Sequence, residues 1–374
     1  MPATAPPPIR RIAITTGGGD APGLNAVICA VTRAALQRGW SCVGIRDGYD
    51  GLLRPERYPD GSGCIALTAE RVEGVAGLGG TLLGSTNQGD PFAYPTAQPD
   101  GSLKLQDRSQ ALLDALVRER IDALVAVGGD GSLAIAHRLA QQGLRVVGVP
   151  KTIDNDLDGT VTTFGFDTAV AFATECIDRL HTTAASHHRV LVVEVMGRYA
   201  GWIALHAGLA GGAHAILLPE LPFDLGPVAA QVARREAQGL AYSIVVVAEG
   251  ARPRDGERAL CAPAAGGHAE RLGGIGEQVS RTLAQLTGKD ARCVVLGHLL
   301  RGGSPSAFDR VAALRFGAAA VRALAAGQSG VMVALDGNDV RPVPLADVAG
   351  RMKAVPLDGD TIATARDLGI CLGQ

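Results

Sequence analysis

The strongest constraint on the fold is a pair of loops at residues 128–132 and 151–156. Each loop follows a short apolar run, 121–127 or 145–149, that is typical of a buried parallel strand. Between the two runs, residues 133–142 predict a helix, which a glycine ends. Because ligands bind at the carboxyl ends of the strands in an open parallel sheet, we expect both loops to face one crevice.

The two loops differ in chemistry. The first supplies three flexible glycines and one carboxylate, which suits phosphate and metal, and the second supplies a lysine, a hydroxyl and two acids. Together they offer what phosphoryl transfer requires. Taken singly, each loop is equally consistent with an ordinary turn, and Asp130 with a helix cap. The residues are Gly128, Gly129, Asp130, Gly131 and Ser132, then Lys151, Thr152, Ile153, Asp154, Asn155 and Asp156.

Composition excludes several classes of protein. The 374 residues suggest about two domains, and 47% hydrophobic but only 4% aromatic content predicts aliphatic cores. A net charge of −2 without a basic stripe argues against nucleic acid as the main partner. No apolar run approaches the roughly 20 residues of a membrane span, so we expect no membrane partner.

The cysteines and the N-terminus bear on location. Seven scattered cysteines without a C-x-x-C pair are typical of reduced thiols in a cytoplasm, rather than a disulfide framework or a zinc site. The N-terminus has no apolar stretch of signal-peptide type. Residues 1–8 form a proline-rich arm that we expect to be disordered.

The rest of the first half alternates strands and helices. A strand at 12–16 leads into a glycine turn that includes Gly18 and Gly19, and then into a helix ending near residue 38. A glycine turn at a helix N-terminus is an anion site, although its spacing matches neither a Walker A loop nor the dinucleotide fingerprint. A second glycine-rich loop spans 77–87, and 91–105 is expected to be an exposed segment.

The second half continues the alternation, which predicts an α/β fold with parallel sheets. Strands are expected at 190–195, 215–218, 243–247 and 293–296, and a helix at 166–181. Arginines near strand ends suggest bidentate capture of a phosphorylated substrate, although any single one is more simply a surface ion pair. These residues, with one histidine suited to hydrogen bonding with the substrate, are Arg189, Arg198, Arg292, Arg301 and His298.

Taken together, the motifs resemble those of the 6-phosphofructokinases of bacterial single-chain length. The resemblance runs from about residue 9 to 335 and is carried by GGDAPGLN, GGTLLGS, GGDGS, PKTIDND, SHHRVLVVEVMGRYAGW, AEG and VLGHLLRGGSPSAFDR. It implies transfer of a phosphoryl group to O1 of fructose 6-phosphate, which gives fructose 1,6-bisphosphate in glycolysis. It also implies Mg²⁺ as cofactor.

The resemblance implies a role for each site residue. Asp154 is the expected base, Thr152 and Asp156 assist it, and Arg198 neutralises charge on the transferring group. Asp130 is the expected Mg²⁺ ligand. The donor is expected to contact Gly18, Gly19, Gly129, Asp130, Gly131 and Ser132. The sugar phosphate is expected to contact Thr152, Ile153, Asp154, Met196, Gly197, Arg198, Glu249, His298 and Arg301, with Arg189 and Arg292 reaching it from a neighbouring subunit.

Such a shared site implies a homo-oligomer, a dimer or a tetramer. The resemblance further implies two doubly wound α/β domains with the active site in the cleft between them. The larger, donor-binding domain is expected at 1–165 plus 300–350. The smaller, sugar-phosphate-binding domain is expected at 166–299 plus 351–374.

The phosphoryl donor depends on two positions of the motifs. Pyrophosphate users resemble GGDDS with PKTIDND, and the common ATP users resemble GGDGS with PGTIDND, so this chain has one mark of each. Glycine at 131 removes a carboxylate that would block and repel the α-phosphate of a nucleotide, which favours ATP. Lys151 places a cation near the donor without excluding ATP. The mixed pair resembles an actinobacterial-like branch that uses ATP.

Two departures and three alternatives remain. Asn87-Gln88 stands where many ATP users carry an arginine, and Cys29 stands where common bacterial members carry an effector-binding arginine. We therefore expect a weak response to nucleoside diphosphate and phosphoenolpyruvate. The alternatives are a pyrophosphate-dependent enzyme, a catalytically silent sugar-phosphate sensor or regulatory subunit, and a relative of the diacylglycerol or NAD kinases.

Overall fold

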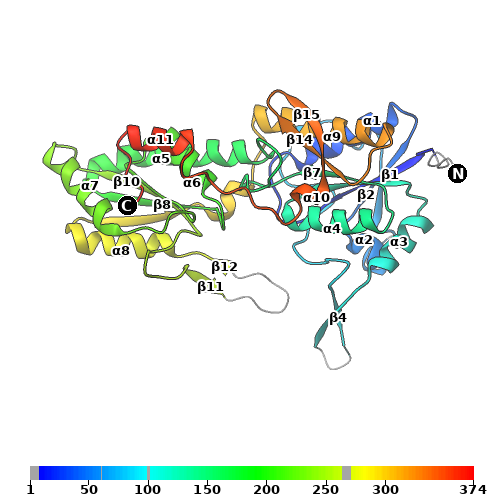
Figure 1. Ribbon diagram of the computed structural model, residues 1–374, viewed down its shortest axis with the longest axis horizontal. Coiled ribbons are helices and arrows are strands. Elements are labelled where there is room, and N and C mark those ends of the chain that lie inside the picture. Colours follow the sequence, from blue (N-terminus) through cyan, green and yellow to red (C-terminus); the bar gives the residue numbers. More distant parts are fainter. Residues whose placement is uncertain (1–7, 60, 99–101, 263–270) are drawn as a thin grey trace.

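Two parallel-rich sheets, each covered by helices on both faces, make up the fold (Figure 1). The computed structural model describes residues 8–59, 61–98, 102–262 and 271–374. All of the predicted arm except Pro8 therefore lies outside the described residues. In the part of the chain that is described, no helix is long and apolar enough to cross a membrane.

The larger sheet has seven strands in the order β15-β14-β7-β6-β1-β2-β3. The five inner strands are parallel, and both edge strands are antiparallel to their neighbours. The bounds are β1 Arg11–Thr16, β2 Ser41–Ile45, β3 Cys64–Leu67, β6 Ala123–Gly128, β7 Val146–Pro150, β14 Val331–Asp336 and β15 Asp339–Pro344.

Side chains of the larger sheet alternate between two cores because successive residues of a strand face opposite sides. In β1, Ile12 and Ile14 join the core under α1 and α9, whereas Ala13 joins the core under α2, α3, α4 and α10. The bounds are α1 Leu24–Leu36, α2 Asp50–Leu53, α3 Ser109–Arg118, α4 Asp130–Gln141, α9 Ala307–Ala325 and α10 Leu345–Val348.

The smaller sheet has four parallel strands in the order β13-β8-β10-β9. In β8, Val190 and Val192 pack with α7 and α8, and Leu191 and Val193 pack with α5, α6 and α11. The bounds are β8 Val190–Val195, β9 Ala215–Leu217, β10 Ser243–Ala248, β13 Ala291–Val295, α5 Phe166–His187, α6 Trp202–Ala210, α7 Leu225–Ala237, α8 Ile275–Thr287 and α11 Asp360–Asp367.

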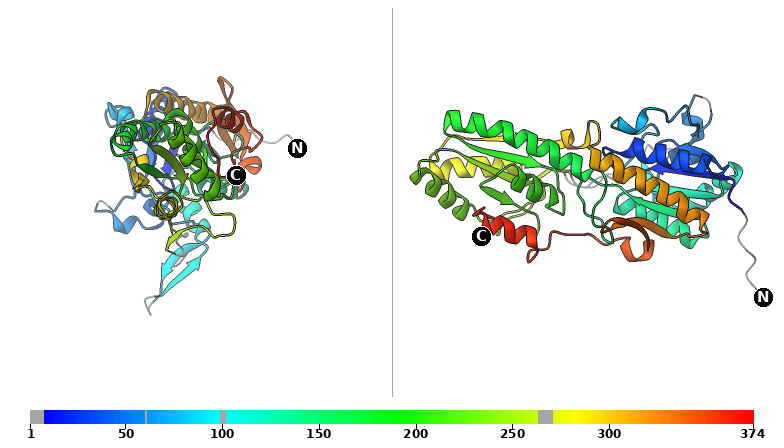
Figure 2. Two further views of the ribbon diagram at one scale, coloured as in Figure 1. Left: turned by 90° about the vertical axis from the view of Figure 1, so that its left-hand side faces the viewer. Right: turned by 90° about the horizontal axis from the view of Figure 1, so that it is seen from above.

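The chain passes between the two sheets more than once. The two helix-covered sheets lie end to end along the long axis of the molecule (Figure 2). After β13, the short helix η3 (Gly297–Arg301) leads to α9 on the larger sheet. After α10, the chain returns to α11 on the smaller sheet. The predicted fold class, α/β with two doubly wound sheets, is confirmed.

Four local predictions need correction. The sheet edges β3 and β15 are antiparallel rather than parallel, and β14 and β15 were not predicted. Helix α5 extends beyond residue 181 to His187. Within the segment expected to be exposed at 91–105, Leu103 and Leu105 are exposed, but Tyr94 is buried with its hydroxyl donating to Asp50, and the β4–β5 hairpin (Tyr94–Ala97 and Leu103–Gln106) was not predicted.

Helix α8 allows a matched test of the core. Leu283 is fully buried against the smaller sheet, whereas Leu286 on the same helix is 55% exposed. We expect Leu283→Ala to lower the free energy of unfolding by about 2–5 kcal/mol, because it leaves a cavity. Leu286→Ala should change it by no more than ~0.5 kcal/mol. Urea unfolding followed by circular dichroism measures both, and equal losses would contradict this packing.

Candidate active site

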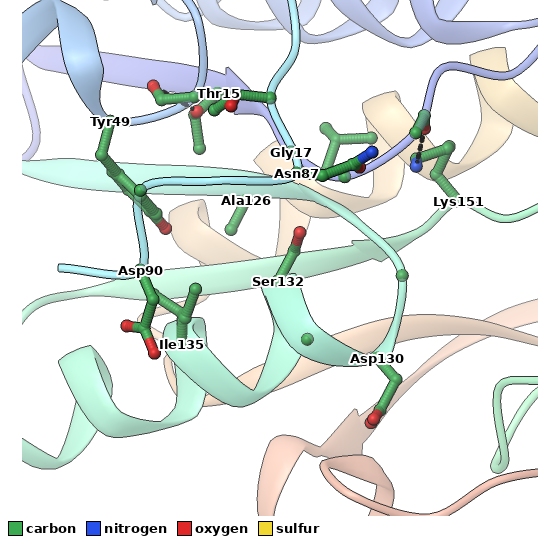
Figure 3. A pocket seen from close by; sticks show the side chains of 18 of the residues that line it. Thr15, Gly17, Tyr49, Asn87, Asp90, Ala126, Asp130, Ser132, Ile135 and Lys151 are labelled. Carbon is green, nitrogen blue, oxygen red and sulfur yellow. Dashed lines mark hydrogen bonds between the residues drawn. The ribbon is translucent and has the colours of Figure 1, made fainter. Parts of the chain in front are cut away.

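The first glycine turn and the two predicted loops follow adjacent strands, β1, β6 and β7. Backbone hydrogen bonds hold them together, since Gly17 N donates to Val127 O (2.9 Å) and Lys151 N donates to Gly128 O (3.0 Å). Between them lies a cavity of about 360 Å³ (Figure 3). The predicted site residues that line it are Gly18, Gly19, Gly129, Asp130, Gly131, Ser132, Lys151, Thr152 and Arg301.

Glycine is required where these loops approach each other. A Cβ on Gly17 would lie 2.6 Å from the Ser132 hydroxyl, and a Cβ on Gly19 would collide with the Arg301 guanidinium. Gly18 has a φ of 76°, which favours glycine. At Gly131, by contrast, an added Cβ would meet nothing within 4 Å. That position is therefore open for a side chain or for a ligand.

Two cations hold the first glycine turn. Lys151 is 3% exposed, and its Nζ donates to the carbonyl of Gly19. Arg301 donates through Nη1 to the carbonyl of Asp20 (3.0 Å). Burial, together with the neighbouring Arg301, lowers the pKa of Lys151 to about 8. The lysine is thus fixed on the turn and faces the cavity.

Asp154 is the carboxylate most perturbed by its surroundings at this site. Its Oδ1 is buried without a hydrogen-bond partner, and its backbone N–H donates to Thr152 Oγ1 (3.1 Å). Burial, followed by repulsion from Asp156, raises the pKa of Asp154 to about 7. Burial also raises the pKa of Asp156. A carboxylate with a free oxygen and a pKa near neutrality suits a general base.

Asp130 begins α4 at the rim of the cavity. Its Oδ1 accepts a hydrogen bond from Gly350 N (2.7 Å), and its side chain points away from Ser132 (Figure 3). Among the described residues, no group of three or more His, Cys, Asp or Glu is arranged to hold a metal. Mg²⁺ is commonly held by one or two carboxylates plus substrate phosphates. The charge of Asp130 lies close enough to Asp156 to raise the pKa of Asp156. The carboxylate oxygens of Asp130 and Asp156, together with substrate phosphates, therefore fit Mg²⁺.

The carboxyl ends of β8 and β10 provide the other side of the site. Glu249 N donates to Val195 O (2.9 Å) and Gly250 N donates to Gly197 O (3.1 Å), which holds the two loops together. Burial raises the pKa of Glu249, and Arg198 and Arg301 oppose that rise. Arg301 also opposes the rise in the pKa of Asp154. Its charge therefore acts on loops of both sheets.

The remaining sugar-side residues differ in exposure. Met196 is partly buried beside the core under α5, and Ile153 is fully buried in that core. His298 is exposed on η3. The Arg198 guanidinium lies 5.8 Å from the centre of the Tyr199 ring.

Arg189 and Arg292 do not join this cluster within one chain. They lie at the amino ends of β8 and β13, opposite the loops that carry Arg198 and Glu249. Both pair with Asp290, at 2.7 and 2.9 Å. Strand polarity thus places these two at the opposite edge of the smaller sheet, and their expected role in the site of a neighbouring subunit stays a prediction.

The sequence also left residues at the site unnoticed. Gly350 and Lys353 contact the two acidic loops from the C-terminal segment, about 200 positions away along the chain. Tyr49, Asp90 and Ile135 line the cavity as well. Of these, Tyr49 could be expected from the sequence, because residues 47–51 form a glycine-containing turn after the apolar run 40–46, and such a turn can line a pocket.

The raised pKa of Asp154 predicts an effect on stability. Between its ordinary value of 3.8 and about 7, the unfolded chain releases a proton that the folded chain retains, so stability falls as pH rises through this window. Asp154→Asn avoids this loss. Metal-free Asp154→Asn should therefore melt several degrees above the parent at pH 8, with the gap closing toward pH 4. Exposed Asp358→Asn is the control, and a gap independent of pH would refute the assignment.

The comparisons with known proteins agree with this geometry. The phosphofructokinase family model matches residues 11–324. An ATP-dependent 6-phosphofructokinase of Chloroflexus aggregans is 52% identical over 365 residues, 98% of each chain. A pyrophosphate–fructose 6-phosphate 1-phosphotransferase of Amycolatopsis mediterranei is 50% identical over 351 residues, 93% of this chain and 97% of that one.

Among solved structures, the T-state phosphofructokinase of Pichia pastoris matches with a TM-score of 0.77 and 30% identity. The match covers 97% of this chain but only 37% of the yeast chain, which is much longer. The family match covers the smaller sheet and five strands of the larger one, with the glycine-rich and acidic loops, and it ends before β14, β15 and the C-terminal segment. The chain belongs to the phosphofructokinase family.

Proposed function

We propose that this protein transfers the γ-phosphoryl group of ATP to O1 of fructose 6-phosphate. The observation that carries the proposal is the buried, unpartnered Oδ1 of Asp154, whose carboxyl has a pKa of about 7. In this role Asp154 accepts the proton of the sugar hydroxyl as the oxygen attacks, and it acts best close to its own pKa. Thr152 and Asp156 hold the reacting region beside it.

On the donor side, the glycine loops bind the phosphates through their backbone N–H groups. The residues in this role are Gly18, Gly19, Gly129, Asp130, Gly131 and Ser132. Mg²⁺ would be held by Asp130 together with the donor phosphates, and it supplies charge neutralisation there. Catalysis rests mainly on positioning the reactants and on neutralising charge. Arg198 neutralises the charge that develops on the transferring phosphoryl group.

On the acceptor side, Met196, Gly197, Glu249, His298 and Arg301 bind the sugar phosphate in this proposal. Ile153 has a fully buried side chain, so it would contribute through its main chain.

We assign one binding role to each of the two domains. Residues 1–165 plus 300–350 bind the donor, and 166–299 plus 351–374 bind the sugar phosphate. The placement of α9, β14 and β15 with the larger sheet, and of α11 with the smaller one, supports this division.

Similarity does not decide the donor, since relatives of 52% and 50% identity carry names with different donors. The open space at Gly131 supports ATP, because an aspartate there would project a second carboxylate toward the phosphates. The pyrophosphate-dependent reaction is the alternative.

We also propose the cytoplasm as the location, which the seven free cysteines support.

Initial rates with fructose 6-phosphate and Mg²⁺, given ATP or pyrophosphate separately, test the donor. We expect turnover with ATP, and a fall in kcat of about 10²–10⁴-fold in Asp154→Asn. Gly131→Asp should lower kcat/KM for ATP by about tenfold or more, because like charges repel. Gly131→Asn, of equal size but neutral, should lower it less.

Other outcomes would change the assignment. Turnover with pyrophosphate alone would give the deciding weight to Lys151. No turnover with either donor by folded protein would favour the silent sensor. Equal losses in Gly131→Asp and Gly131→Asn would show that bulk, rather than charge, determines the choice of donor.

We further propose a homo-oligomer, a dimer or tetramer, in which Arg189 and Arg292 complete the sugar-phosphate site of a neighbouring subunit. Their distance from the loops of their own chain supports this arrangement. In mixed oligomers of Asp154→Asn with Arg292→Ala, one shared site regains both native residues. Mixing should therefore restore a sizeable fraction of parent activity, about a quarter in a randomly mixed dimer. Activity no greater than the sum of the separate variants would contradict sharing.

A further inference from the structure

The C-terminal strap, which we define as residues 350–355, connects the two sheets beside the site. It runs from α10 on the larger sheet toward α11 on the smaller one (Figure 2). Along it, Gly350 N donates to Asp130 Oδ1 (2.7 Å), Lys353 N donates to Asp156 O (2.9 Å) and Val355 N donates to Glu220 Oε1 (2.8 Å). The strap therefore binds the donor loop, the acceptor loop and the smaller sheet in turn.

Lys353 makes the densest contacts of the strap. Its Nζ donates to Asn155 Oδ1 (2.9 Å) and to the carbonyls of Thr160 and Val161 (both 3.0 Å). These three acceptors match the three hydrogens of an ammonium group. Nζ also lies 5.6 Å from the centre of the Trp202 ring. Burial lowers the pKa of Lys353 to about 8, which marks the cost of holding a cation here.

Asn155 connects Lys353 to the chemistry. It separates Asp154 from Asp156 and has a φ of 51°, in the left-handed region that few non-glycine residues adopt. It is 4% exposed, and its Oδ1 accepts from Thr163 N (3.2 Å) as well as from Lys353. Because the left-handed turn at Asn155 sets the relative directions of the carboxylates on either side, the outside contacts that hold Asn155 also hold those two side chains.

We propose that Lys353 is a positioning residue that holds the Asn155 turn and thereby aims Asp154 and Asp156 at the reacting groups. The inference rests on the proposed phosphoryl transfer and adds a residue from the C-terminal strap to it. Lys353 acts through Asn155 and contacts no reacting atom. Its removal takes a donor from three oxygens, of which Asn155 Oδ1 keeps only Thr163 N, so the turn relaxes while the glycine loops keep their own contacts.

Lys353→Met tests this proposal with a side chain of similar length and no charge. A small misplacement of the base costs on the order of 10²-fold, so we expect kcat to fall by about 10–100-fold. KM for ATP should change by less than about twofold, since the donor loop is untouched. Arg351→Met removes an exposed cation from the same strap and should leave kcat unchanged.

A second set of variants separates positioning from loss of the strap. Asn155→Gly keeps the left-handed conformation accessible and removes the amide. If Lys353 acts through Asn155, the double variant Lys353→Met/Asn155→Gly should be no slower than the slower of the two single variants. The reason is that each substitution breaks the same Lys353–Asn155 contact. In a Trp40→Phe background, Trp202 is the only tryptophan, so the fluorescence of the protein reports on it alone. If Lys353→Met leaves the wavelength of maximum emission unchanged, the strap stays docked beside Trp202.

Three results would overturn the inference. These are parent-level kcat in Lys353→Met, losses that multiply in the double variant, and a fall in kcat that accompanies a red-shifted Trp202 emission. Activity of the parent enzyme separates this failure from failure of the proposed function. An inactive parent would refute phosphoryl transfer itself, whereas an active parent with an unaffected Lys353→Met refutes only the role of Lys353.

Discussion

A buried carboxylate without a hydrogen-bond partner is the constraint on which the site depends. Removing a charged group from water is costly, and Asp154 meets that cost by a raised pKa rather than by forming an ion pair. Lys151 and Arg301 lower its pKa from a distance, and Asp156 raises it. The balance leaves a carboxyl that changes protonation near neutrality, which suits a general base.

Close approach of backbones is the second requirement, and glycine meets it. Loops of the site lie against each other where Gly79 contacts the carbonyl of Gly303 and where Gly250 contacts the carbonyl of Arg198. A Cβ at either position would overlap backbone atoms, so the chain has no tolerance there. The 50 glycines of the sequence are therefore partly a consequence of the close packing of loops beyond the strand ends.

Local patterns predicted the parts of the fold that depend on local physics. The apolar run before the GGDGS loop is strand β6, and the loops on either side of α4 do meet at one cavity, because parallel strands present the same ends. The edge strand β15 escaped prediction because its exposed sequence, DVRPVP, carries a weak apolar signal, whereas β3 and β14 were missed although their sequences are largely apolar. Lys353 escaped because its partners are main-chain carbonyls and an amide about 200 residues away, which leave no pattern in its own neighbourhood.

The contacts of Gly131 and Lys151 explain how one chain can carry both residues. Lys151 is buried and bound to the Gly19 carbonyl, so it shapes the first glycine turn as well as adding charge near the donor. Its cation therefore serves any donor whose phosphates reach that turn. Position 131 lines the same cavity, and a side chain there would extend into open space. Charge at 151 is thus compatible with either donor, and for this reason we propose that bulk and charge at 131, rather than the lysine, discriminate between them.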